Sequence, residues 1–270
     1  MPELPEVETT RAGIAPLIEQ RRVSGVELRA TTLRQALDPA LKDLLPGQRV
    51  QRVWRRGKYL ILSLEQGSLL LHLGMSGSLR FVRADLPAGK HDHVDLVFGD
   101  HCLRLRDPRK FGTLLWTADD PLAHRLLRHL GPEPLSDAFD ADWLYRRSRD
   151  RKLAIKSFIM HGQTVVGVGN IYANEALFAA GIQPKRACGR ISQVRYRLLV
   201  THIKQILQAA IEQGGTTLRD FQNERGQPGY FAQRLQVYGH AGEPCPKCAR
   251  PITQAVIGQR SSYYCTHCQR

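Results

Sequence analysis

Four cysteines near the end of the chain constrain its fold more than any other feature of the sequence. They form two Cys-x-x-Cys pairs, Cys245 with Cys248 and Cys265 with Cys268, separated by 16 residues. This spacing is typical of a four-thiolate zinc site. Because structural zinc contributes on the order of 10 kcal/mol in small fingers, it can order a hairpin that has almost no core. The sequence therefore predicts one structural zinc ion and a zinc-held hairpin, with Arg260 near its tip.

The charge of the chain favours a polyanionic partner. Of 270 residues, 39 are Lys or Arg and 25 are Asp or Glu, which gives a net charge of +14 and a pI near 9.9. Nucleic acid and an anionic membrane surface both fit this charge, and nucleic acid is preferred. No apolar run approaches the roughly 18 residues of a transmembrane span, and the beginning of the chain lacks the apolar core of a signal peptide. We expect a cytoplasmic protein.

Hydrophobic periodicity divides the chain into a β-rich first half and a helical second half. After an expected helix over 3–19, alternation of period two favours a β-sandwich or a barrel. The expected strands are 50–54, 59–64, 68–73, 79–82, 94–98 and 103–106. Gly131-Pro132-Glu133-Pro134 is a predicted linker, and helices are expected over 152–161, over 170–180 and between Ser192 and Gly214.

The chain begins Met1-Pro2-Glu3-Leu4-Pro5-Glu6, which admits two interpretations. Proline and acidic residues suit the first turn of a helix, where a missing N–H costs nothing and the dipole favours negative charge. Alternatively, removal of Met1 leaves a secondary amine on Pro2. An α-amino group has a pKa near about 8 and is partly unprotonated at neutral pH, so it can attack an electrophilic carbon. The terminus alone favours the helix start.

Several loops carry residues suited to DNA. Gly167-Val168-Gly169-Asn170 precedes a predicted helix start whose free N–H groups could hold a phosphate, although a glycine turn between packed helices is equally typical. The 107–112 segment offers basic residues and an aromatic, Arg109 and Phe111 among them, which suit insertion into a duplex, although a solvated turn with one buried Phe explains it as well. Met75 lies near a predicted turn, but methionine usually fills a core. Lys58 is ordinarily an exposed lysine, and His91 fits a polar turn or a phosphate contact.

Taken together, these segments resemble the bacterial formamidopyrimidine-DNA glycosylases, of the Fpg/Nei family, over essentially the whole chain. The resemblance is carried by six segments and the zinc finger: Pro2 to Thr9, Lys58-Tyr59-Leu60, His72 to Gly77, Lys90 to Asp95, Asp107-Pro108-Arg109 and Val166 to Tyr172. It implies a two-domain α+β enzyme with a catalytic β-sandwich domain over 1–131, a linker over 132–136, a helix-two-turn-helix domain over 137–235 and a zinc finger over 236–270.

The resemblance also implies an activity: excision of oxidised purines from DNA, followed by cleavage of the abasic strand. Pro2 is then the nucleophile, whose nitrogen attacks C1′ and forms a Schiff base, and Glu3 the general acid and base. Such an acid needs a raised pKa, which burial and a neighbour such as Glu6 would supply. Lys58 matches the residue for proton transfer in β-elimination, and Arg260 the arginine of δ-elimination.

An enzyme that acts at C1′ must extrude the nucleotide, and a wedge must fill the vacancy. Met75, Arg109 and Phe111 align with the family's wedge. The matched DNA-contacting positions are His91, Arg109, Arg151 and Asn170, with Lys152 as an alternative to Arg151 and the Thr216-Thr217-Leu218 segment as a candidate base-recognition loop. The implied partner is damaged double-stranded DNA, bound by a monomer without a membrane or a nucleotide cofactor, which would associate the protein with the nucleoid.

Two other functions remain open at this level. Charge and zinc finger alone also fit a non-catalytic protein that binds distorted duplexes. The related endonuclease VIII group acts on oxidised pyrimidines, and Leu4 favours the purine branch because that group typically has glycine at this position.

Overall fold

The chain divides into two units, and each has its own core. The computed structural model describes residues 2–216 and 234–270. Within these residues, the first unit comprises 2–128 and 213–216, and the second comprises 129–212 and 234–270. No helix among the described residues is long and apolar enough to cross a membrane.

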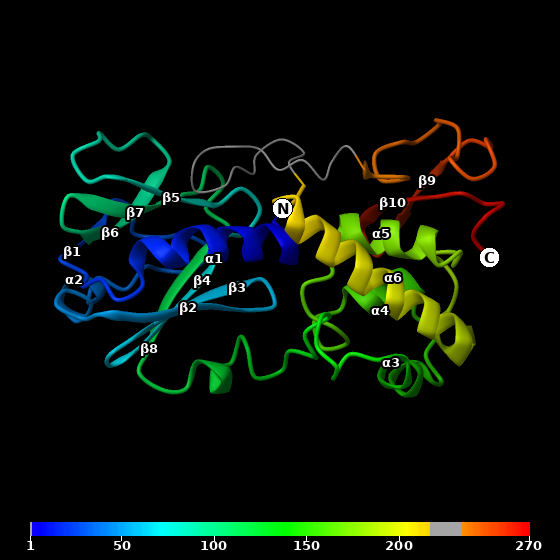
Figure 1. The fold of residues 1–270 in the computed structure, drawn as a ribbon, viewed down its shortest axis with the longest axis horizontal. Helices are drawn as coiled ribbons and strands as arrows, with labels where there is room; N and C mark the ends of the chain where they lie inside the picture. Colours follow the sequence, from blue (N-terminus) through cyan, green and yellow to red (C-terminus); the bar gives the residue numbers. More distant parts are fainter. Residues whose placement is uncertain (1, 217–233) are drawn as a thin grey trace. The chain divides into compact units, whose positions relative to one another are not determined.

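The first unit is a β-sandwich flanked by helices (Figure 1). One antiparallel sheet has the order β1-β6-β7-β5 and the other β2-β3-β4-β8. Apolar side chains of both sheets and of the first helix share one core, which includes Ile14, Leu62, Leu69, Phe98 and Leu105. The elements are α1 (Leu4–Ile18), β1 (Gly25–Leu28), α2 (Leu41–Leu44), β2 (Val50–Arg56), β3 (Tyr59–Leu64), β4 (Gly67–His72), β5 (Ser78–Arg83), β6 (Asp92–Phe98), β7 (His101–Arg106), β8 (Thr113–Thr117) and η1 (Pro121–Ala123).

The predicted α+β fold class is confirmed, and the two sheets form a sandwich rather than a closed barrel. Each of the six expected strands is present, with ends shifted by up to two residues. The strands β1 and β8 were not expected. Each lies at an edge of its sheet and pairs with a strand distant in sequence, Gly25 with Val97 and Ser68 with Thr117. Such strands are defined by their partner more than by their own residues.

Strand register brings the functional loops of the first unit to one end of the sandwich. In one sheet Tyr59 pairs with His72, and His72 pairs with Thr113. In the other sheet Ser78 and Asp92 both pair with Arg106. Two connecting segments, 73–77 between β4 and β5 and 107–112 between β7 and β8, join these two rows. The paired residues of the two sheets therefore lie at the same end of the sandwich.

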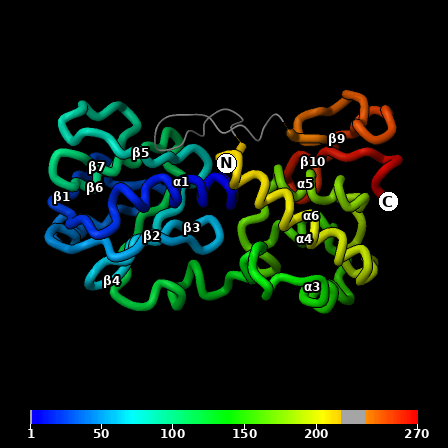
Figure 2. Tube along the Cα trace, viewed as in Figure 1, coloured from blue at the N-terminus to red at the C-terminus, as the bar shows by residue number. Residues whose placement is uncertain are grey.

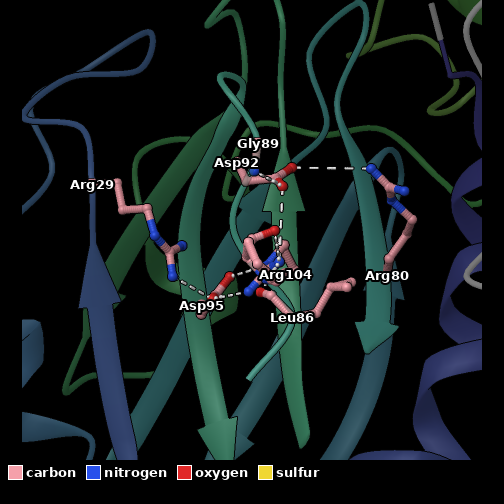
Figure 3. A network of polar contacts seen from close by, with 8 residues as sticks. Arg29, Arg80, Leu86, Gly89, Asp92, Asp95 and Arg104 are labelled. Atoms are coloured by element: carbon pink, nitrogen blue, oxygen red, sulfur yellow. Dashed lines mark hydrogen bonds and ion pairs between the residues drawn. The ribbon is translucent and has the colours of Figure 1, made fainter. Parts of the chain in front are cut away.

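A buried ion-pair network stabilises the sheet of β1, β5, β6 and β7 (Figure 3). The Arg104 guanidinium bonds both carboxylate oxygens of Asp95, at 2.9 and 2.8 Å, and Arg29 adds a third contact at 2.6 Å. Burial acts to raise the pKa of Asp95, but the two guanidinium groups outweigh it and hold that pKa below its usual value. Arg104 also donates to the carbonyl of Leu86, which fixes the turn that precedes His91.

The second unit is helical and ends in a two-stranded hairpin (Figure 2). The long helix expected between Ser192 and Gly214 is present, and its buried face includes Leu199, Ile203, Leu207 and Ala210. The elements of the second unit are α3 (Ala141–Ser148), α4 (Ile155–Met160), α5 (Asn170–Ala179), η2 (Cys188–Arg190), the long helix α6 (Gln193–Glu212), β9 (Thr253–Ile257) and β10 (Arg260–Tyr264).

Candidate active site and DNA interface

Pro2 and Glu3 lie buried at the N-terminal end of α1, and Glu6 fixes their position. Glu3 and Glu6 are each 2% exposed. Oε2 of Glu6 accepts a hydrogen bond from the amide of Glu3 at 2.7 Å, and Oε1 accepts one from the amide of Thr216 at 2.7 Å. A single carboxylate therefore holds both the Pro2–Glu3 peptide and the segment that follows α6.

This second segment needs glycine to approach the carboxylate. Gly215 has a φ of +82°, and a Cβ at this position would lie 3.0 Å from Oε1 of Glu6. A side chain would therefore strain the backbone and crowd the carboxylate. Thr217 and Leu218, expected to continue a base-recognition loop, lie outside the described residues, as does Met1.

Lys58 lies in the turn between β2 and β3, close to the first turns of α1. Its side chain is half-buried. Arg55, near the end of β2, donates to the carbonyl of Gly57 at 2.8 Å and to Oε2 of Glu8 on α1 at 2.9 Å. These contacts tie the turn to the helix that begins with the candidate nucleophile, so α1 and the Lys58 turn form one part of the site.

His72 is a neutral imidazole at the same end of the sheet. The amide of Gly74 donates to Nδ1 of His72 at 2.9 Å, which requires that this nitrogen be unprotonated. Burial, aided by the positive charges of Lys58 and Arg34, lowers the pKa of His72 to about 4. The ring therefore supports the backbone of the 73–77 segment and carries no charge near neutral pH.

The depressed pKa of His72 predicts a loss of stability on mild acidification. An unfolded chain takes up a proton at His72 below about pH 6.5, whereas the folded chain does so only near about pH 4, so stability falls as the pH drops through this window. The full shift corresponds to about 3 kcal/mol, and we expect about 2 kcal/mol because the side chain is not completely buried. His72→Asn offers Oδ1 to the amide of Gly74 and carries no titrating group, so the stability of this variant should depend less on pH over the same window.

Urea unfolding of the first unit between pH 7 and pH 4.5 measures this difference. Replacing Trp143 by Phe in both proteins leaves only the two tryptophans of the first unit, Trp54 and Trp116, as fluorescent reporters. Equal pH slopes for His72→Asn and its parent would contradict the assignment of a neutral, buried imidazole.

The candidate wedge residues project from two neighbouring segments at this end of the sandwich. Arg109 and Phe111 are exposed, Phe111 by 46%, and Met75 is half-buried. Nη2 of Arg109 donates to the carbonyl of Met75 at 3.2 Å, so the two segments are in contact. The half-buried His91 lies beside them, since its carbonyl accepts from the amide of Asp107 at 3.0 Å. Structure thus brings together all four of these sequence candidates.

In the second unit, Asn170 lies in the first turn of α5 and contacts the zinc-finger hairpin. Its Nδ2 donates to the carbonyl of Ser261 at 3.0 Å. The fully buried Lys156 of α4 donates to the same carbonyl at 2.8 Å and to Oγ of Ser262 at 2.6 Å. These contacts fix the strand directly beside Arg260, whose own side chain is exposed at the start of β10.

Two further polar residues of α5 hold the C-terminal segment. Oδ1 of Asn174 accepts from the amide of Tyr263 at 2.8 Å, and the Glu175 carboxylate accepts from the three successive amides of 236–238 at 2.8 to 3.0 Å. Burial raises the pKa of Glu175, and the three amide donors act against that rise. One helix therefore positions both the hairpin and the segment that leads to it.

Arg151 and Lys152 are exposed and line one basic groove together with Lys185, Arg186 and Arg190. The groove lies between the residues before α4 and those around η2. Besides these basic side chains the groove is lined by one acidic residue, Asp150, so its net charge is positive, and both candidates for phosphate contact lie in it.

The four cysteines form a site that fits one zinc ion. All four Sγ atoms lie within 4.8 Å of one another. The Sγ atoms of Cys245 and Cys268 are 3.9 Å apart, and those of Cys248 and Cys265 are 3.5 Å apart. A tetrahedral ion with Zn–S bonds of about 2.3 Å separates its sulfur ligands by about 3.8 Å. When bound, the zinc crosslinks the two Cys-x-x-Cys turns, because each turn supplies two of its four ligands. Four thiolate ligands leave no open coordination position, so the ion is structural rather than catalytic.

Removal of the zinc should disorder the hairpin and leave the first unit folded. The apolar cluster around the site has few buried members, and two of these are the ligands Cys245 and Cys265. We expect Cys245→Ser with Cys248→Ser to reduce bound zinc from about one ion per chain to none and to weaken DNA binding at least tenfold. Metal analysis, DNA titration and thermal unfolding of the first unit measure these effects. Unchanged DNA affinity in a zinc-free variant would contradict this role.

Comparison with known proteins decides the family. The chain matches the formamidopyrimidine-DNA glycosylase N-terminal domain over residues 1–114, the H2TH domain of the same enzymes over 130–222, and a zinc finger found in FPG and IleRS over 242–270. The chain belongs to the formamidopyrimidine-DNA glycosylase family. This membership makes it a DNA-repair glycosylase with abasic-site lyase activity and one structural zinc ion, and the resemblance inferred from the motifs is confirmed.

Relatives match over their whole length. The formamidopyrimidine-DNA glycosylases of Methylococcus capsulatus and Teredinibacter turnerae are 58% and 56% identical over 271 residues, and each alignment covers 100% of both chains. A Lactococcus lactis FPG variant in complex with Fapy-dG-containing DNA has a TM-score of 0.93 at 34% identity and full coverage of both chains. MutM from Thermus thermophilus has a TM-score of 0.88 at 37% identity, covering 99% of this chain and 98% of that one.

Sequence reasoning did not assign several polar residues that organise the site. Asn174 and Glu175 interrupt an otherwise apolar helix, and Lys156 does the same in α4; buried polar residues of this kind usually have dedicated partners. A polar residue within an apolar helical stretch is therefore a feature of the sequence that could have indicated these contacts. His72 and Asp107 lie inside the recognised motifs, but their partners depend on contacts between segments that are distant in the sequence.

Proposed function

We propose that this enzyme excises oxidised purines, such as 8-oxoguanine and formamidopyrimidines, from duplex DNA and then cleaves the strand by β,δ-elimination. The proposal rests chiefly on the buried Pro2–Glu3 start, held by Glu6 at the end of α1. It is supported by the relatives' name and by the Lactococcus lactis proteins solved with Fapy-dG-containing DNA and with abasic-site-containing DNA.

In the proposed first step, the lone pair of the Pro2 nitrogen forms a bond to C1′ of the damaged nucleotide. The bond from C1′ to the base breaks, and the base leaves with the electron pair and takes up the proton that the Pro2 nitrogen loses. Glu3 donates a proton to the sugar-ring oxygen as the ring opens, which leaves an iminium ion between Pro2 and C1′.

The strand is then cut by two eliminations. Loss of a proton from C2′ of the iminium drives departure of the 3′ phosphate, and we assign Lys58 to this proton transfer. Loss of a proton from C4′ of the resulting conjugated iminium then allows the 5′ phosphate to leave from C5′, with Arg260 next to the departing oxygens. Water finally hydrolyses the imine and regenerates the Pro2 amine. An arginine suits this position because its fork of donors matches a phosphate.

Recognition of the DNA is assigned to residues of both units. Met75, Arg109 and Phe111 form the wedge that replaces the extruded nucleotide, since they emerge together at one end of the sandwich. His91, Asn170 and Arg151 or Lys152 contact phosphates in this proposal, because phosphate oxygens are bound by hydrogen-bond donors and by positive charge. Damaged duplex DNA is the partner of a monomeric enzyme in this proposal.

The choice between oxidised purines and oxidised pyrimidines has a direct experiment. Duplexes that contain 8-oxoguanine or thymine glycol at the same position are compared in single-turnover reactions. We expect faster excision of 8-oxoguanine and strand ends with phosphate on both sides of the gap. Faster excision of thymine glycol would contradict the purine assignment, and unaltered DNA in both reactions would favour a binding protein without catalysis.

A further inference from the structure

Asp107 is a fully buried carboxylate that takes no part in the proposed chemistry. It follows the last residue of β7 and is 0% exposed. The described part of the chain gives its side chain three neutral donors: the hydroxyl of Ser76 and the amides of Arg109 and Gly112. Burial of a carboxylate held by neutral donors is costly, so the position of Asp107 calls for an explanation other than core packing.

Its two oxygens bind two different segments. Oδ1 accepts from Oγ of Ser76 at 2.8 Å, and Ser76 is the residue after Met75. Oδ2 accepts from the amide of Gly112 at 2.7 Å, which closes the loop that carries Arg109 and Phe111. One buried side chain therefore connects the backbones that present all three candidate wedge residues.

The two segments are also in direct backbone contact. A Cβ on Gly74, whose φ is +64°, would lie 2.4 Å from the carbonyl carbon of Phe111. A Cβ on Gly112 would lie 3.0 Å from Oδ2 of Asp107. The peptide of Asp107 extends the connection, since its carbonyl accepts from Nε2 of His93 at 2.9 Å. There is little room for the segments to move independently.

We propose that Asp107 is a positioning residue that couples the 73–77 segment to the 107–112 loop, so that Met75, Arg109 and Phe111 enter the duplex as one rigid wedge. This inference rests on the proposed function. Extrusion of a nucleotide costs a few kcal/mol, which the inserted side chains must offset. A wedge whose parts move separately fills the vacancy less often, so loss of the coupling lowers the fraction of DNA in the extruded state.

Three substitutions distinguish the coupling of the two segments from the integrity of the 107–112 loop itself. Ser76→Ala removes the two hydrogen bonds that the Ser76 hydroxyl makes across the segments, with Asp107 and with the amide of Arg109, and leaves the contact of Asp107 with Gly112. Asp107→Ala removes the contacts of the Asp107 side chain with Ser76 and with Gly112. Asp107→Asn can turn its oxygen toward Gly112 and its amide toward the Ser76 hydroxyl, so it should partly restore the function lost in Asp107→Ala.

The measured quantity is the rate of 8-oxoguanine excision relative to the rate of cleavage at a preformed abasic site, which has no base to extrude. We expect this ratio to fall roughly tenfold in Ser76→Ala and further in Asp107→Ala, with an intermediate value in Asp107→Asn. A 2-aminopurine placed beside the lesion should show a matching loss of the fluorescence rise that accompanies unstacking.

Gln48→Ala is the matched control. Gln48 is a buried polar residue of the same unit that accepts from the amide of Gln66, in the turn at the opposite end of β3. It should lower thermal stability and leave the ratio unchanged. If Ser76→Ala and Asp107→Ala lose excision and abasic cleavage equally, or if the ratio of the two rates also falls in Gln48→Ala, the role of Asp107 in coupling the segments is wrong. The proposed function is not affected by either result. Failure of the unaltered enzyme to excise 8-oxoguanine would overturn the proposed function as well.

Discussion

A chain that carries one extra residue before Pro2 should excise no base and form no covalent adduct with DNA. In such a chain the Pro2 nitrogen is a tertiary amide, whose lone pair is delocalised into the carbonyl and cannot attack C1′. We therefore expect excision to fall to the uncatalysed background. Binding of lesion DNA should persist, because the residues proposed to form the wedge and to contact phosphates are unchanged.

The comparison needs two proteins that differ by this one residue. A removable N-terminal extension that leaves either glycine or nothing before Pro2 provides them, and intact mass verifies each terminus. Excision is followed on DNA containing 8-oxoguanine, and binding by fluorescence anisotropy. Substantial excision by the extended chain would show that another group is the nucleophile.

Replacement of Glu3 by glutamine should lower base excision by roughly two to four orders of magnitude. This is the usual contribution of a positioned general acid and base. Glutamine has nearly the same shape, so the end of α1 should remain folded around Glu6. The loss should be smaller on a preformed abasic site, where the base has already gone and the free aldehyde reacts more readily with the Pro2 amine.

Glu19→Gln provides the control for this experiment. Glu19 lies at the other end of α1, where Oε1 accepts from the amide of Val53 at 2.7 Å. The same chemical change there should affect stability and leave excision close to that of the unaltered enzyme. Equal excision rates for Glu3→Gln and Glu19→Gln would contradict the role of Glu3.

Local patterns predicted the parts of this fold that are defined by neighbouring residues. Alternating apolar residues indicated β3 and β4, and apolar residues at steps of three and four indicated the helix α6, because each pattern places its apolar side chains on one face. Spacing alone indicated the zinc site of Cys245 and its partners. In these cases few residues, close in sequence, determine the local structure.

Contacts between distant segments could not be predicted in the same way. The edge strand β1 depends on β6, and the Glu6 carboxylate joins residues as distant as Glu3 and Thr216. The link from Asp107 to Ser76 arises because strand register brings two loops together. Such contacts depend on how the whole sandwich is assembled, so the sequence offered candidate wedge residues and gave no indication of the contacts between their segments.

The measurement that tests the central claim most directly is borohydride trapping with intact-mass analysis. Enzyme shown to lack Met1 is mixed with duplex DNA that contains 8-oxoguanine opposite cytosine, reduced, and digested to locate the modified residue. We predict a stable adduct in which the reduced sugar is attached to the Pro2 nitrogen. Absence of an adduct, or its attachment to a lysine such as Lys58, would contradict this account.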